Sequence, residues 1–175
     1  MLFHPSLLPT AAPWTIRPFA EGDRAGLLRL NASNRPAVAP LDKATLTELM
    51  AYDGHHLVAV ERTGGVVGYL LSFASDSAYD DTEICELRRR LPEPFVYICQ
   101  VVIAPGYRRQ RIGHAFYDEM EKFARGRGVR VLGCDVNTHP ANPASFAFHR
   151  RLGFVEHSPG IAGDGTAIMF FVRRW

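Results

Sequence analysis

An apolar run in the middle of the chain, Phe95-Val-Tyr-Ile-Cys-Gln-Val-Val-Ile103, most constrains how the chain can fold. Hydrophobic side chains fill almost every position, without the polar alternation of a strand that has one face in water. The run therefore predicts a central strand, buried on both faces of a sheet. Pro105 ends the strand, a short basic loop follows, and a helical period begins near Arg111. The chain is expected to form an α/β layer structure around this strand.

Other elements follow from the period of the apolar residues and from the turn residues between them. Asn142 caps the last helix, Pro143 takes its first position and Gly153 ends it. Residues 83–90 are compatible with a further short helix. The order predicts a mixed, mostly antiparallel sheet of six to seven strands with about four helices and one βαβ crossover. We expect strands over residues 14–18, 57–61, 66–74, 95–103, 129–136, 154–157 and 166–172, and helices over residues 20–31, 42–52, 111–124 and 143–152.

Length and composition fit one domain over residues 1–175, with residues 1–12 as a loose N-terminal arm. The net charge of +2 is too small to imply nucleic-acid binding. Cys85, Cys99 and Cys134 lack metal-ligand spacing, so no metal is expected, and their sparse use indicates a reducing compartment. The N-terminus lacks the basic region of a signal peptide, and no apolar stretch is long enough to cross a bilayer. We therefore expect a cytoplasmic protein with no membrane partner.

The loop after the central strand gathers positive charge beside a helix start. Arg108, Arg109 and Arg111 bring guanidinium groups, which bind phosphate through paired N–H donors. Unpaired N–H groups at the start of the next helix add partial positive charge. Gly113 has no Cβ, so the backbone can approach a bulky ligand there. These residues predict a phosphate or pyrophosphate site, and a solvated basic turn with a packing glycine is the alternative.

Two segments resemble the GNAT superfamily of N-acetyltransferases. Ile103-Ala-Pro105 followed by Arg108-Arg-Gln-Arg-Ile-Gly113 is similar to motif A, V-x-P then R/Q-x-x-G-x-G/A, with Arg111 in place of the first glycine. Asn142-Pro-Ala-Ser-Phe-Ala-Phe-His-Arg-Arg-Leu-Gly-Phe154 is similar to motif B, N-x-x-A/S-x-x-L/F-Y-x-x-x-G-F. One helix and one strand separate the two segments, as in the superfamily. Within it, residues 36–38 and 136–149 resemble a group of bacterial predicted acetyltransferases.

The resemblance implies a single GNAT-like domain with acetyl-CoA as the acetyl donor. Strands 95–103 and 129–136 would splay apart, and the pantetheine arm would insert between them, bonded by the peptide groups of Val101, Val102 and Ile103. A primary amine of a small molecule or peptide would then take the acetyl group by direct attack. The loop, the helix start and motif B would complete the cofactor site through Arg108, Arg109, Gln110, Arg111, Ile112, Gly113, Asn142 and Phe148.

Two side chains are the first candidates for the proton transfers. His149 stands where most members of the superfamily have the tyrosine that protonates the departing thiolate, and a protonated histidine can donate. Packing or hydrogen bonding to the cofactor is its alternative role. Asp135, which ends the strand before motif B, is the first candidate for the general base. Tyr97, Glu83 or a water chain are alternatives, and an amine that arrives neutral needs no base.

The acceptor amine cannot be identified from the sequence. Its pocket is expected between the two N-terminal helices, the 31–41 loop, the 75–94 segment and the terminal hairpin, and the acidic residues there weakly favour a cationic amine. The alternatives are a catalytically silent CoA-binding module and a transferase for another acyl-CoA. A nucleotide binder of another fold is disfavoured, because no glycine-rich fingerprint follows an early strand.

Two smaller expectations concern the surface. His55-His56 is expected to be an exposed pair in a turn rather than a metal site. A homodimer is expected by analogy, helped by the apolar strand over residues 167–172 near a possible sheet edge.

Overall fold

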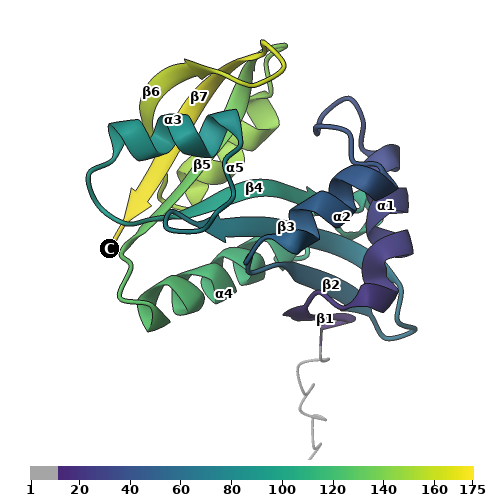
Figure 1. Cartoon of the computed structure of the whole chain (residues 1–175). Helices are drawn as coiled ribbons and strands as arrows, with labels where there is room; N and C mark the ends of the chain where they lie inside the picture. Colours follow the sequence, from purple (N-terminus) through teal and green to yellow (C-terminus); the bar gives the residue numbers. More distant parts are fainter. Residues whose placement is uncertain (1–11) are drawn as a thin grey trace, which may run out of the picture.

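The computed structural model describes residues 12–175, so most of the expected N-terminal arm lies outside the described residues. One seven-stranded sheet has the order β1-β2-β3-β4-β5-β7-β6 (Figure 1). The strands are β1 (Trp14–Pro18), β2 (Leu57–Glu61), β3 (Val66–Ala74), β4 (Val96–Ile103), β5 (Val131–His139), β6 (Val155–Ile161) and β7 (Ala167–Arg174). The helices are α1 (Arg24–Ser33), α2 (Lys43–Ala51), α3 (Thr82–Arg90), α4 (Ile112–Gly126) and α5 (Pro143–Arg151), with 3-10 turns η1 (Glu21–Asp23) and η2 (Pro105–Tyr107).

The helices cover both faces of the sheet (Figure 1). Helices α1, α2 and α3 pack on one face, here called the first face, and α4 and α5 pack on the other, the second face. Strand β3 contributes to both cores: Tyr69, Leu71 and Phe73 join the core of the first face, and Val67 and Leu70 that of the second. A sheet buried on both sides explains why the central strands read as continuous apolar runs.

Strands β4 and β5 are paired only at their first residues. They run parallel through Val96–Leu132, Tyr97–Gly133 and Ile98–Cys134, and no pair follows. Strand β4 continues to Ile103 because β3 pairs with it on its other side, and β5 continues to His139 because β7 holds it. The two strands therefore diverge towards their C-terminal ends (Figure 1). The mixed sheet, the single parallel crossover and the splayed central pair were all predicted, and the structure confirms them.

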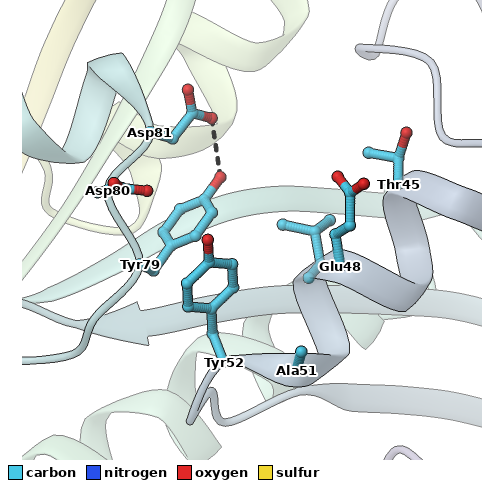
Figure 2. A pocket seen from close by; sticks show the side chains of 8 residues that line it. Thr45, Glu48, Ala51, Tyr52, Tyr79, Asp80 and Asp81 are labelled. Atoms are coloured by element: carbon cyan, nitrogen blue, oxygen red, sulfur yellow. Dashed lines mark hydrogen bonds between the residues drawn. The ribbon is translucent and has the colours of Figure 1, made fainter.

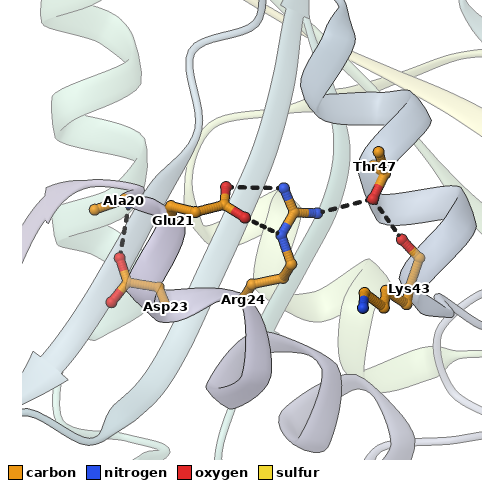
Figure 3. Close-up of polar contacts among 6 residues, drawn as sticks. All are labelled: Ala20, Glu21, Asp23, Arg24, Lys43 and Thr47. Atoms are coloured by element: carbon orange, nitrogen blue, oxygen red, sulfur yellow. Dashed lines mark hydrogen bonds and ion pairs between the residues drawn. The ribbon is translucent and has the colours of Figure 1, made fainter.

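Polar contacts fix the two N-terminal helices to each other. Arg24 at the start of α1 holds Glu21 through two bonds of 2.7 and 2.9 Å, and it also donates to the hydroxyl of Thr47 on α2 at 3.3 Å (Figure 3). Fully buried Asn31 donates to the Tyr69 hydroxyl at 2.9 Å and accepts from the backbone N–H of Leu41 at 2.9 Å. These contacts tie the loop between α1 and α2 to β3, beside the divergence of β4 and β5.

Several expected elements are corrected. Residues 12–175 form five α-helices where about four were expected, because α3 is a full helix capped by the Asp81 side chain. The first helix begins later, at Arg24, because the Asp23 carboxylate accepts from the Ala20 N–H and closes the 3-10 turn before it. Strand β7 lies next to an edge of the sheet but is not itself the edge strand, because it pairs with β5 and with β6 along its length. The edge strands are β1 and β6, so β7 offers no free edge to a second copy, and the dimer stays a prediction.

The His55-His56 pair was also expected to be exposed, and this is wrong. The His55 ring stacks on Phe123 with 4.0 Å between ring centroids, and His56 packs edge-on against Phe73. Burial lowers the pKa of His56 to about 4. Both rings therefore serve packing at the start of β2. Within residues 12–175, no helix combines the length and hydrophobicity needed to cross a bilayer.

The contact between α4 and α5 can be tested at Gly113. A Cβ at this buried glycine would lie 2.7 Å from Cζ of Phe148, so Gly113→Ala must displace the Phe148 ring. We expect a loss of about 1–3 kcal/mol in the free energy of unfolding, as overpacking typically causes. Gly126→Ala, at the far end of the same helix with nothing within 4 Å of its Cβ, should leave stability unchanged or raise it slightly. Equal unfolding midpoints in urea for the two variants would contradict this packing.

Candidate active site

The divergence of β4 and β5 leaves an open seam in the middle of the sheet. Beyond Ile98 and Cys134 the facing backbone groups of the two strands have no ladder partner in each other. Buried N–H and C=O groups need hydrogen bonds, so this seam suits an extended ligand that can pair like a strand. Val101, Val102 and Ile103, predicted to bind pantetheine, lie on the divergent half of β4.

The basic loop turns sharply between β4 and α4. Arg109 and Arg111 adopt left-handed backbone conformations with φ of 62° and 67°, which favour glycine. Arg111 is also the residue before the first turn of α4, whose start carries no side-chain cap. The first glycine of motif A is thus replaced by an arginine in the conformation that a glycine would adopt most easily. The chain thus forms a turn of the kind that glycine favours, and a guanidinium is added to it.

The three arginines of this loop differ in whether their side chains are free to bind a ligand. Arg108 is tied down, donating to Oδ1 of Asn34 at 2.7 Å and to the Ile103 carbonyl at 3.2 Å. Arg109 and Arg111 are exposed and form no ion pair within residues 12–175. Gln110 donates to the Gly106 carbonyl at 3.0 Å and so braces the turn. Two free guanidinium groups therefore stand beside the uncapped start of α4, an arrangement that attracts an anion.

Motif B holds α5 against α4. Asn142 accepts a hydrogen bond from the Ser145 N–H at 3.2 Å and caps α5, as predicted. Phe148 packs on Gly113 and meets the Tyr117 ring edge-to-face at 5.8 Å between centroids. Ile112, at the start of α4, is buried in the same core. In this structure Gly113 is therefore needed for the packing of α5 on α4, a role that the sequence offered only as an alternative.

Asp135 lies on the first face, just beyond the last pair of β4 and β5. Its Oδ1 accepts a hydrogen bond from the Tyr97 hydroxyl at 2.5 Å. Burial raises the pKa of Asp135 to about 6, against the hydrogen bond from Tyr97, which lowers it. Burial also raises the pKa of Tyr97 well above its ordinary value. Two of the three side chains considered as general bases are thus in direct contact.

Glu83, the third candidate, comes from α3 to the same region. One of its oxygens accepts from the Gly163 N–H at 3.2 Å, while Oε2 is buried with no partner among the described residues. Burial and the charge of Asp81 raise the pKa of Glu83. The charge of Glu83 in turn contributes to raising the pKa values of Tyr97 and Cys99, so these groups are neighbours. Segments far apart in sequence therefore build one polar cluster at the seam.

His149 lies on the second face and is buried, with 3% of its surface exposed. Its Nδ1 faces the Ser145 carbonyl at 2.9 Å and must donate there, because a carbonyl oxygen only accepts. In the neutral ring Nε2 then accepts from the Tyr117 hydroxyl at 2.7 Å. Burial lowers the pKa of His149, against the hydrogen bond to Ser145, which raises it. Nothing in the sequence pointed to Tyr117 as its partner.

An open pocket of about 400 Å³ lies beside the polar cluster, between α2 and the segment before α3 (Figure 2). The acceptor pocket was predicted partly at these two elements. The two tyrosines that line it, Tyr52 and Tyr79, were not among the predicted site residues. The lining residues are Thr45, Glu48, Leu49, Ala51, Tyr52, Tyr79, Asp80 and Asp81.

The comparisons with known proteins agree with this geometry. The sequence model of the acetyltransferase (GNAT) family matches residues 25–154. The chain belongs to this family. A comparison with curated proteins gives no significant match.

Solved structures share the fold across almost the whole chain. Arabidopsis thaliana NAA60 in complex with acetyl-CoA superposes with a TM-score of 0.71 at 18% identity, over 92% of this chain and 98% of that one. The ribosomal-protein-S18-alanine N-acetyltransferase from Escherichia coli gives 0.68 at 16% identity, over 92% and 93%. A phosphinothricin acetyltransferase from Sinorhizobium meliloti in complex with acetyl-CoA gives 0.68 at 20% identity, over 93% and 88%. At these identities the likeness shows the fold alone.

Arg111 allows conformation and charge to be separated. Arg111→Gly restores the residue that favours a left-handed backbone, so the free energy of unfolding should stay unchanged or rise by up to about 1 kcal/mol. The same variant removes one exposed guanidinium, and the dissociation constant for CoA should rise about tenfold. Calorimetry and urea unfolding measure the two effects.

Arg130→Ala is the matched control. It removes an exposed charge just before β5, at the opposite end of the parallel strands from the basic loop. Its CoA affinity should equal that of the wild type. If Arg111→Gly binds CoA as tightly as this control, Arg111 takes no part in anion binding.

Proposed function

We propose that this GNAT-family protein is an N-acetyltransferase that moves the acetyl group of acetyl-CoA directly to a primary amine. The observation that carries the proposal is the seam between β4 and β5, which has an anion-attracting loop at one side and a half-buried carboxylate, Asp135, on the first face. A strand-like ligand with a phosphate group and a reactive end fits such a seam, and an amine can approach that end from the pocket side.

The residues present fit acetyl-CoA. Arg109, Arg111 and the N–H groups at the start of α4 would hold its pyrophosphate. The backbone of Val101–Ile103 would pair with its pantetheine arm in the seam. When bound, acetyl-CoA supplies an activated acyl group as a thioester. Backbone N–H groups of the divergent strands would polarise the acyl carbonyl and lower the barrier to attack by the amine.

Asp135 takes the proton of the attacking amine in this proposal. A carboxyl group with a pKa of about 6 is ionised at neutral pH, yet it is a stronger base than an ordinary aspartate. Tyr97 holds one of its oxygens at 2.5 Å and so orients the other. Glu83, whose Oε2 has no partner among residues 12–175, adds a second carboxylate whose charge acts on Tyr97.

His149 is the proposed proton donor to the departing thiolate, and the structure sets a condition on that role. Only the protonated ring can donate, and burial lowers the pKa of His149 below its ordinary range. The protonated ring would have N–H donors on both sides, and the Tyr117 hydroxyl would be freed to pass a proton onwards. The role is therefore confined to mildly acidic conditions.

Two alternatives predict different behaviour. A silent CoA-binding module would bind CoA but release none of it from acetyl-CoA when amines are added. A transferase for another acyl group would release CoA faster from a longer acyl-CoA. The polar cluster of Asp135, Tyr97 and Glu83 supports an enzyme, because raised carboxyl pKa values at an opening are typical of catalytic sites and cost stability. Thiol release with a panel of amines and acyl-CoA donors separates the three.

Replacing Asp135 should raise stability and abolish catalysis together. Folding raises the pKa of Asp135 from 3.8 to about 6, so its ionised form destabilises the folded protein, and this cost develops as pH rises between those two values. Asp135→Asn stays neutral. We expect it to be more stable than the wild type by roughly 1–3 kcal/mol at pH 8, with about half of that difference remaining at pH 5. Its kcat should fall by about 10²-fold or more.

Urea unfolding at the two pH values and steady-state kinetics measure these effects. Asp118→Asn, which removes an exposed carboxylate on α4, should change neither stability nor kcat. An Asp135→Asn enzyme with wild-type kcat would remove Asp135 from the mechanism, even if the stability prediction holds.

The pH profile tests His149. The base Asp135 must be ionised, so kcat rises through about pH 6, while the acid His149 must be protonated, so kcat falls above its lowered pKa. We expect a narrow maximum in the mildly acidic range at saturating amine. The variant His157→Asn, which replaces an exposed histidine on β6, should have the same pH profile of kcat as the wild type. A plateau that extends above pH 7.5 would show that the thiolate is protonated by another group or by solvent.

A further inference from the structure

The pocket of about 400 Å³ opens directly beside the seam. Tyr79 forms the wall that they share: its hydroxyl donates to Oδ2 of Asp81 at 2.8 Å and lies 3.6 Å from Sγ of Cys99. Cys99 is the first residue of β4 after the last pair with β5. A small molecule in the pocket can therefore place one end at the seam, close to the polar cluster.

The aromatic wall is built from rings that pack against one another. The Tyr79 ring stacks on Phe73 with 3.8 Å between centroids and meets Tyr52 edge-to-face at 5.4 Å. Tyr52 in turn meets Phe73 edge-to-face at 6.3 Å. Figure 2 shows the two tyrosine rings between Asp81 on one side and Glu48 on the other. Aromatic faces bind aliphatic chains and attract cations through the ring quadrupole.

The charged residues of the pocket are all acidic. Glu48, Asp80 and Asp81 line it, and no lysine, arginine or histidine does. Glu48 and Asp80 form no ion pair within residues 12–175, and Figure 2 shows their carboxylates at opposite walls. Glu83, whose pKa is raised by burial and by the charge of Asp81, lies outside this lining, and its Oε2 is buried without a partner among residues 12–175. An unpaired buried carboxylate oxygen favours a donor from a ligand.

We infer that the acceptor is an aliphatic amine with a second cationic group a few carbon atoms from the reacting amine. The reacting amine lies at the seam beside Asp135. The chain lies against Tyr79 and Tyr52, and the second cation is held by Glu48 and Asp80 against the aromatic wall. The inference rests on the proposed acetyl transfer and adds the substrate class to it.

Matched acceptors test the inference. 1,5-Diaminopentane and n-pentylamine present the same reacting amine with and without the second cation, and 5-aminopentanoate carries an anion in its place. We expect kcat/KM for the diamine to exceed that for pentylamine about tenfold or more, with the aminopentanoate slowest. In the Glu48→Gln/Asp80→Asn double variant the ratio of diamine to pentylamine should fall towards one. Asp118→Asn on the second face should leave the ratio unchanged.

Two further acceptors distinguish a free diamine from an amino acid or a peptide as the substrate. A lysine amide carries the same two cations on an amino acid, and a peptide with an N-terminal alanine carries a single amine on an extended backbone. Faster acetylation of the alanine peptide than of the diamine would overturn the inference. So would equal rates for diamine and pentylamine in the wild type, and in both cases acetyl transfer itself would stand. If CoA binds and no amine in the panel releases it from acetyl-CoA, the proposed function fails together with the inference.

Discussion

The parallel pairing of β4 with β5 stops after three residue pairs, and the rest of the site depends on this. The two strands can diverge because each is hydrogen-bonded to another strand on its outer side. Strand β3 pairs with β4 as far as Ile103, and β7 pairs with β5 as far as His139. The sheet therefore keeps its hydrogen bonds on the outer sides and opens along an inner seam. Because the two strands are parallel, their C-terminal ends lead into the loops before α4 and α5, so both motifs are brought to the same opening.

The two faces of the sheet divide the chemistry between them. On the first face, a polar cluster with raised carboxyl pKa values adjoins an acidic, aromatic pocket. On the second face, α4 and α5 are joined by a buried histidine–tyrosine contact and by the fit of Phe148 over Gly113. Both sides contain features that lower the stability of the folded chain: a half-buried aspartate with a raised pKa at the seam, and two arginines in left-handed backbone conformations. Such costs persist where the surrounding structure enforces them, and they cluster at functional sites.

The strands were the part of the fold most readable from sequence. The bounds of β2 and β3 agree with the prediction, because an apolar β-rich hairpin around Thr63-Gly-Gly65 leaves little choice. The start of α5 was predicted from Asn142 and Pro143 for the same local reason. The position of β7 was not readable, since the order of strands depends on which faces remain uncovered once the sheet assembles. A terminal hairpin looks the same in sequence whether its last strand is internal or at an edge.

The individual residues of the site could be predicted from the sequence, but the contacts between them could not. Asp135, Tyr97 and Glu83 were separate candidates for one role, and only the fold shows that Tyr97 donates to Asp135 and that the charge of Glu83 acts on Tyr97. The contact between His149 and Tyr117 joins helices about thirty residues apart, so no local pattern reveals it. The roles of Tyr79 and Tyr52 were hidden because a ring that lines a pocket and a ring in the core have the same sequence signature.

Pairing of an extended ligand with the open seam is tested most directly by residue-resolved amide hydrogen exchange with and without CoA. If the pantetheine arm lies between the strands, amides of β4 beyond Ile98 that face β5 should exchange about ten times more slowly, or slower still, when CoA is bound. The reason is that each of these amides gains a hydrogen-bond acceptor. Amides of β2, far from the seam, should not change. CoA that binds with protection confined to the Arg108–Gly113 loop, and none in the divergent half of β4, would contradict the account.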